Sequence, residues 1–289
     1  MSKIIKKNSS KLFSGGFFFN ILNYFPFSLL ESFVESRLKL NWLNCHYSLS
    51  QSKHKTDIIK MFSNIMGDFG ITTNEHFLPG AYIPKTGGCI IVGTHDGHFV
   101  DIIFLAQNIL QYRTDIKFIS STLIKPIKEF RPWCFFIDIS FNKKRNTANV
   151  AMFKEAIQWL RSGKLLVVFP ESPIASEPSN KWEPRLPWSS LPARFAKAAN
   201  VPIIPIKIIV PVPFLTRLCT NLGVFFYNIR LSMITVKFRT FLSQIHARQV
   251  YLTSGKTVTA IIGNAISPKD DRAYGNKLRD HIYGLSENQ

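Results

Sequence analysis

The sequence predicts an α/β fold whose mostly parallel sheet is flanked by helices. Short apolar runs without a polar interruption, such as residues 165–169, are typical of strands buried on both faces of a sheet. Segments with a helical spacing of apolar residues lie between these runs, and this alternation is typical of βαβ units. The chain has 289 residues, of which 46% are hydrophobic, so it is long enough for one sizeable domain with an appendage.

The predicted elements begin at residue 55, with a helix at 55–69 in which apolar side chains recur at helical spacing. A loop rich in Pro and Gly follows and leads into a strand at 90–92, and a helix at 99–110 comes next. The other predicted elements, in chain order, are a strand at 116–120, a short helix at 125–130, a strand at 134–138, a helix at 147–161, a strand at 165–169, a helix at 190–199 and a strand at 201–209. No internal repeat or long linker interrupts this region, so we expect one domain over residues 56–289.

The first 55 residues differ from the rest, and we expect them to form a basic, Phe-rich, membrane-associating segment. Residues 1–11 contain four lysines, and residues 12–30 are uncharged and contain six phenylalanines. A spanning helix needs about 20 mostly apolar residues, and two asparagines and Pro26 interrupt this stretch. We therefore favour a segment that lies in the membrane interface with its lysines at the headgroups. A spanning helix and ordinary core packing remain alternatives.

The charge balance points to an anionic partner. Lys and Arg number 36 against 18 Asp and Glu, which makes the net charge +18, and the isoelectric point is about 9.9. The chain also contains 25 phenylalanines, which favours an anionic membrane surface over nucleic acid, because nucleic-acid binders rarely need so much apolar surface. We therefore expect a membrane partner and no nucleic acid.

The cysteines and histidines do not form a metal-binding or disulfide pattern. The four cysteines lie far apart without a Cys-x-x-Cys pair, as expected of free thiols in a reducing compartment. His95 and His98 have no third ligand at a recognisable spacing, so we expect no metal site.

His95 and Asp101 are the candidate catalytic pair. His95 follows the predicted strand at 90–92, and Asp101 lies in the first turn of the next predicted helix. Open α/β sheets place their sites where such strands end. A histidine there can act as a base near neutral pH, and an adjacent carboxylate can orient it. The alternative is a pair of polar loop residues in which Asp101 only complements the helix dipole, and this stretch alone does not decide between them.

Four blocks of sequence resemble motifs of the glycerolipid acyltransferase superfamily, which includes glycerol-3-phosphate and lysophosphatidic acid acyltransferases. The blocks are residues 94–101, 135–138, 168–171 and 201–206, in the family's order. Three departures stand out. Five residues separate His95 from Asp101 instead of four, and Ser140 stands where an Arg is common. Glu171 is followed by Ser172-Pro173-Ile174 instead of Gly-Thr-Arg.

The resemblance implies a glycerol-3-phosphate acyltransferase-like fold, with residues 56–289 as the acyltransferase domain. It implies that His95 is the general base and that Asp101 fixes its tautomer. The acyl group would pass from acyl-CoA or acyl-carrier protein, as a substrate and not a bound cofactor, to a hydroxyl of glycerol-3-phosphate or lysophosphatidic acid in phospholipid synthesis. The alternatives are a lysophospholipid acyltransferase with another acceptor, or an inactive membrane-surface protein on the same fold.

The resemblance also implies where substrate binds. The third block supplies Phe169, Pro170 and Glu171 as substrate-binding residues. Because two expected arginines are absent, we expect nearby basic residues to hold the acceptor phosphate, namely Lys143, Lys144 or Arg145, helped by Lys181 or Arg185. A solvated basic loop that faces lipid headgroups is the alternative. We expect a membrane-associated protein whose active site faces the cytoplasm.

The N-terminal segment generates a first testable prediction. Each lysine near an anionic leaflet is worth about 1 kcal/mol, and the phenylalanines add apolar insertion. A chain that starts at Lys55 should therefore bind anionic vesicles more weakly than the full chain in a sedimentation assay. Equal binding of both chains at matched salt would contradict the prediction. Alkaline carbonate extraction of the full chain would distinguish a peripheral segment from a spanning one.

Overall fold

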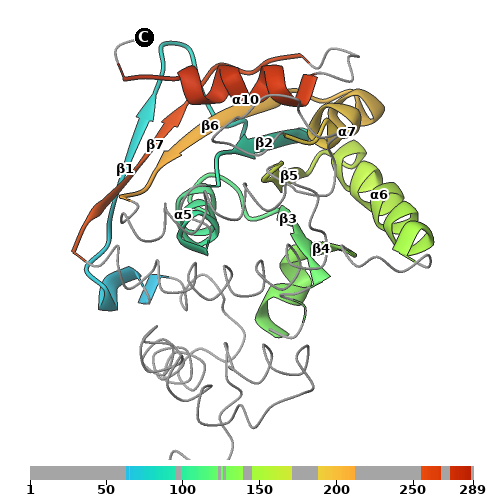
Figure 1. Cartoon of the computed structure of the whole chain (residues 1–289), viewed down its shortest axis with the longest axis horizontal. Helices are drawn as coiled ribbons and strands as arrows, with labels where there is room; N and C mark the ends of the chain where they lie inside the picture. Colours follow the sequence, from blue (N-terminus) through green and yellow to red (C-terminus); the bar gives the residue numbers. More distant parts are fainter. Residues whose placement is uncertain are drawn as a thin grey trace, which may run out of the picture.

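A seven-stranded sheet forms the centre of the part of the chain that the computed structural model describes, which is residues 63–64, 66–95, 99–122, 125, 128–138, 145–170, 188–211, 255–267 and 274–287. The strand order is β1-β7-β6-β2-β5-β3-β4 (Figure 1). The strands are β1 (Thr72–Phe77), β2 (Cys89–Gly93), β3 (Ile116–Ser121), β4 (Cys134–Ile137), β5 (Leu165–Val168), β6 (Ile203–Ile209) and β7 (Thr257–Ile262). The five strands from β6 to β4 are parallel, which confirms the predicted fold class.

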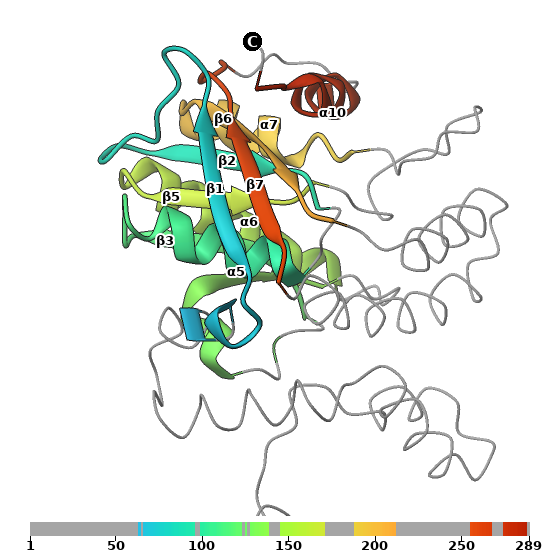
Figure 2. The same cartoon turned by 90° about the vertical axis from the view of Figure 1, so that its left-hand side faces the viewer.

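One edge of the sheet runs in the opposite direction. β7 pairs antiparallel with β6 and parallel with β1, so β1 and β7 oppose the other strands (Figure 2). Neither strand is in the predicted set. β1 has the sequence TTNEHF with a largely exposed or half-buried pattern, so it has no apolar run to mark it.

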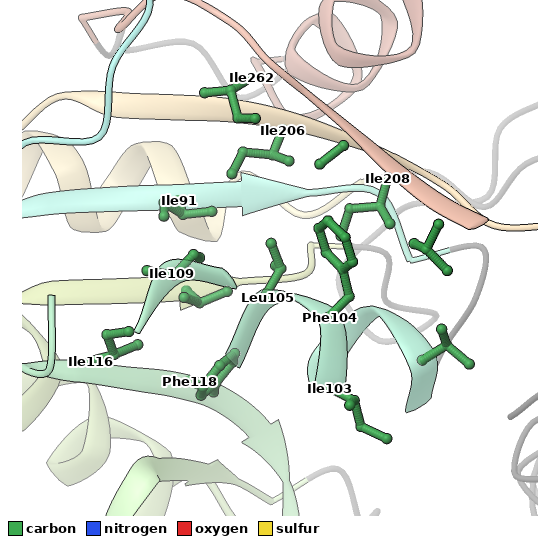
Figure 3. Close-up of a cluster of buried hydrophobic side chains, with 14 of the residues drawn as sticks. Ile91, Ile103, Phe104, Leu105, Ile109, Ile116, Phe118, Ile206, Ile208 and Ile262 are labelled. Carbon is green, nitrogen blue, oxygen red and sulfur yellow. The ribbon is translucent and has the colours of Figure 1, made fainter. Parts of the chain in front are cut away.

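Helices cover both faces of the sheet, as the continuous apolar strands require. Helix α5 (Phe99–Ile109) packs on one face, where its apolar side chains meet those of β2, β3, β6 and β7 (Figure 3). The other face is covered by α6 (Arg145–Arg161), α7 (Leu191–Ala199) and α10 (Tyr274–Gly284). Figure 1 shows these three helices together on the side of the sheet away from α5.

The amino-terminal edge of the parallel strands is held together by one buried side chain. The guanidinium of Arg113, 4% exposed, donates to the carbonyl oxygens of Pro84, Gly87 and Gly163 and to both carboxylate oxygens of Asp115. The Arg113 guanidinium also holds the pKa of Asp115 below its usual range. These hydrogen bonds join the loops that precede β2, β3 and β5.

Several predicted boundaries need correction. The short helix predicted at 125–130 is a 3-10 helix at Lys128–Trp133, which contains Pro132; proline lacks the N–H that a longer α-helix needs. Helix α6 begins at Arg145, two residues before its predicted start, so the backbone of Arg145 is helical. Helix α10 was not predicted.

The remaining helices and strands agree with the prediction to within two residues at each end. Residues 63–64 and 66–68, within the predicted helix at 55–69, are helical. The expected membrane segment and the domain boundary at residue 55 lie outside the described residues. No described helix is both long and apolar enough to cross a membrane.

Candidate active site

The site begins where the chain leaves β2. All five residues of β2 are buried, between β5 on one side and β6 on the other. The N–H of Thr94 still pairs with the carbonyl of Ile206 at 3.2 Å. Beyond that point the hydroxyl of Thr94 accepts from the N–H of Ile208 at 2.8 Å and donates to the Ile208 carbonyl at 3.1 Å. A side chain thus satisfies the backbone of β6 where the main chain of β2 turns away.

His95 follows Thr94 and contacts Asp101 from the first turn of α5. The distance between His95 Nδ1 and Asp101 Oδ2 is 3.2 Å. Asp101 is fully buried and the His95 side chain is 23% exposed, so the carboxylate is shielded from water while the imidazole remains accessible. The start of a helix also stabilises a negative charge. A spacing of five residues therefore still brings the two side chains together.

Phe169 adds a second contact to the imidazole. The rings of His95 and Phe169 stack with their centroids 4.4 Å apart and their planes 19° from parallel. They meet because β2 and β5 are parallel neighbours, with Val92 in register with Val168, so both strands end at the same edge. The ring of Phe169 also packs against the core on the α5 face of the sheet.

Gly93 provides the space for this stack. A Cβ on Gly93 would lie 3.2 Å from Cε1 and 3.6 Å from Cδ1 of Phe169. The first of these distances is shorter than ordinary van der Waals contact, so a side chain here would press on the aromatic ring. The small residue that ends β2 therefore permits this close packing, and a larger one would require the ring to shift.

The segment that follows Phe169 returns to the same place. The N–H of Ser189 donates to the carbonyl of Pro170 at 3.0 Å, which closes the base of the connection between β5 and α7. Three predicted substrate-binding residues, Glu171, Lys181 and Arg185, belong to this connection and lie outside the described residues. Phe169 and Pro170 lie at its base.

A second connection, from β4 to α6, is held in a similar way. The side-chain amide of Asn149 accepts from the backbone N–H of Asp138 at 2.8 Å and donates to the carbonyl of Asp138 at 3.0 Å. This pair of bonds ties the end of β4 to the first turns of α6. Lys143 and Lys144 lie between them, outside the described residues, and only the backbone of Arg145 is described.

The thiols in the described part of the chain are buried. Cys89 and Cys134 are both free and buried, as predicted for them. Burial raises the pKa of Cys89 to about 11 and that of Cys134 to about 12, so both are neutral at physiological pH. Among the described residues, no group of three or more His, Cys, Asp or Glu side chains could hold a metal ion.

Comparison with known proteins identifies the domain. The structure brings a His–Asp pair to the carboxyl ends of the parallel strands, where open α/β sheets place their sites and where a histidine can act as a general base. Residues 78–209 match the family model described as Acyltransferase. The predicted membership of the glycerolipid acyltransferase superfamily is therefore confirmed for this domain, and the protein is an acyltransferase.

The other comparisons are less informative. The crystal structure of the 1-acyl-sn-glycerophosphate (LPA) acyltransferase PlsC from Thermotoga maritima aligns over 93% of this chain and 93% of its own, with 14% sequence identity and a TM-score of 0.43. A similarity at this level assigns no substrate. No protein of curated function matches the chain significantly.

Two contacts of the site were beyond the sequence-based prediction. The motif includes Thr94, but nothing in the pattern marks its hydroxyl as a partner of Ile208 on β6. Asn149 lies on a predicted helix and has no motif around it. Ile208 is distant from Thr94 along the chain, and Asp138 lies at the end of β4. Only the strand order and the start of α6 in the structure reveal these contacts.

The bonds of Thr94 generate a second prediction. Replacing Thr94 with Val keeps the shape but leaves a buried N–H and carbonyl of Ile208 without this partner, and each such loss costs about 1–3 kcal/mol. Thr94→Val should therefore lower the free energy of unfolding measured by denaturant titration. Thr94→Ser, which keeps the hydroxyl, is the matched control. A Val variant as stable as the Ser variant would show that the hydroxyl is not needed.

Proposed function

We propose that this protein transfers a fatty acyl group from acyl-CoA or acyl-carrier protein to a hydroxyl of glycerol-3-phosphate or lysophosphatidic acid, with His95 as the general base. The observation that carries the proposal is the contact between His95 and the buried Asp101, inside a domain of the acyltransferase family. The carboxylate would hold the tautomer in which Nδ1 carries a proton and donates it to Asp101 in a hydrogen bond. The base would then act through Nε2.

The reaction needs a positioned base and no covalent enzyme intermediate. The acceptor hydroxyl oxygen attacks the thioester carbonyl carbon while its proton passes to Nε2 of His95. Asp101 stabilises the resulting imidazolium, as the aspartate does in Ser-His-Asp sites. The carbon–sulfur bond then breaks and the leaving thiolate takes that proton, so the products are an ester and a free thiol.

Removing the base generates a third prediction. A general base contributes about 10²–10⁴-fold to the rate, so His95→Ala should lower kcat by at least about 10²-fold while circular dichroism shows an unchanged fold. The measurement is release of free thiol from acyl-CoA with each candidate acceptor. His281→Ala, which removes an exposed imidazole from α10, is the matched control and should keep full activity.

The same assay tests the alternative base. Only two residues separate His98 from Asp101 in the sequence, which is too few for the family spacing, so His98→Ala should be milder than His95→Ala. The reverse order of effects would move the base to His98. Activity of His95→Ala close to that of the unchanged protein would contradict the proposal.

The acceptor is proposed to be held through its phosphate by basic residues of the two connections at this edge. Arg145 begins α6, whose first turn contains no acidic residue, and the start of a helix favours an anion. Arg185 lies four residues before Ser189 in the sequence. The N–H of Ser189 donates to the carbonyl of Pro170, which directly follows the Phe169 that stacks on His95, and this supports a contribution from the segment.

The candidate phosphate ligands generate a fourth prediction, which steady-state kinetics can test. Replacing Lys143, Lys144, Arg145, Lys181 or Arg185 singly with Ala should raise the KM of the phosphorylated acceptor and leave the KM of the acyl donor nearly unchanged, because only acceptor binding is weakened. Lys154→Ala, an exposed position on α6, is the control. Weaker membrane binding with an unchanged acceptor KM would favour a basic loop that faces headgroups.

The substrate and the membrane are linked in this proposal. Both acceptors belong to phospholipid synthesis and carry a phosphate, and acyl products partition into lipid. A basic protein, with net charge +18, suits an anionic membrane surface, and we propose that the site faces the cytoplasm. Activity with a lysophospholipid acceptor in preference to both phosphate monoesters would favour the alternative acceptor instead.

A further inference from the structure

We propose that Phe169 is a positioning residue, whose ring fixes the plane of the His95 imidazole, and that Gly93 is required because it leaves room for that ring. The inference rests on the proposed role of His95 as the base. It assigns to Phe169 a part in the chemical step instead of the part in substrate binding that the sequence motif implies.

The hydrogen bond to Asp101 does not by itself orient the imidazole. A single contact between Nδ1 and Oδ2, here 3.2 Å, determines the direction of one ring atom but permits the ring to turn about the line that joins the two atoms. The stacked ring of Phe169, 4.4 Å away and 19° from parallel, blocks that turn. Both contacts restrict where Nε2 points, and a base needs this direction to be defined to accept a proton from a bound hydroxyl.

Phe169 is itself held firmly. It follows the buried strand β5 directly, its ring packs against the core beneath α5, and the carbonyl of the next residue, Pro170, accepts a hydrogen bond from Ser189. The backbone on both sides of Phe169 is therefore held and its side chain packs on the core, so the ring has less freedom to move than a ring on a free loop.

Gly93 is the third member of this arrangement. A Cβ at this position would lie 3.2 Å from the Phe169 ring, which is too close for the ring to stay where it is. The backbone of Gly93 has no left-handed φ angle, so conformational freedom does not explain the glycine. The space next to Phe169 does explain it, and a methyl group there should push the ring against or away from His95.

The test compares Phe169→Leu, Phe169→Tyr and Gly93→Ala. Because a small misplacement of reacting groups costs up to about 10²-fold, Phe169→Leu should lower kcat by about 10- to 100-fold with little change in either KM. Phe169→Tyr keeps the ring and should stay close to the unchanged protein. Phe153→Leu, which removes an aromatic contact with Phe195 on the α6 face, is the matched control and should keep full activity.

An NMR measurement that does not depend on turnover complements the kinetics. The protons of the His95 ring lie against the face of Phe169, so they should show an upfield ring-current shift in the NMR spectrum of the histidine-labelled protein. That shift should disappear in Phe169→Leu, persist in Phe169→Tyr and change in Gly93→Ala. An unchanged His95 spectrum in Phe169→Leu would overturn the proposal.

Further comparisons of variants distinguish failure of this proposal from failure of the proposed base. If Gly93→Ala acts through the ring, the double variant with Phe169→Leu should lose less activity than the product of the two single losses, and independent losses would overturn the role of Gly93. A higher KM for long-chain acyl donors with unchanged kcat in Phe169→Leu would assign Phe169 to substrate binding and overturn its positioning role. An active His95→Ala variant would instead show that the proposed base is wrong.

Discussion

The arrangement of the site depends on how the chain leaves the most enclosed strand of the sheet. β2 lies between two parallel neighbours and all of its residues are buried, so water does not satisfy the backbone groups of its surroundings. An unmade hydrogen bond in such a place costs about 1–3 kcal/mol. The hydroxyl of Thr94 makes the two bonds to Ile208, which permits the main chain to turn out of the sheet. His95 therefore lies just beyond a fully buried strand, next to the residue that satisfies the backbone of β6.

Parallel pairing then brings together residues that are far apart in the sequence. The ends of β2 and β5 meet because the strands are in register, which places Phe169 against His95, and the first turn of α5 supplies Asp101. Direct acyl transfer requires no enzyme nucleophile, and the buried thiol of Cys89 lies at the opposite end of β2 and is neutral at physiological pH. The proposed reaction thus depends on the orientation of one imidazole.

Acceptor recognition is proposed to rest on different parts of the fold. The proposed base follows the buried strand β2. The candidate phosphate ligands belong to two connections whose ends are fixed, by Asn149 on Asp138 and by Ser189 on Pro170. This separation permits the connections to change in sequence without disturbing the base. The departures of the second and third motif blocks from the family pattern fall in these two connections, which agrees with a change that affects the acceptor and not the reaction.

The sequence by itself determined the parallel core, the superfamily and the His–Asp pair, because continuous apolar runs, helical periodicity and local motifs are written in consecutive residues. It did not reveal β1, which is a polar edge strand, or β7, which pairs antiparallel with β6. Only the tertiary structure decided which strands are neighbours, and with that the stack of Phe169 on His95 and the bonds of Thr94. The physical reason is that periodicity records which side chains are buried, whereas pairing in a sheet joins residues that are distant along the chain.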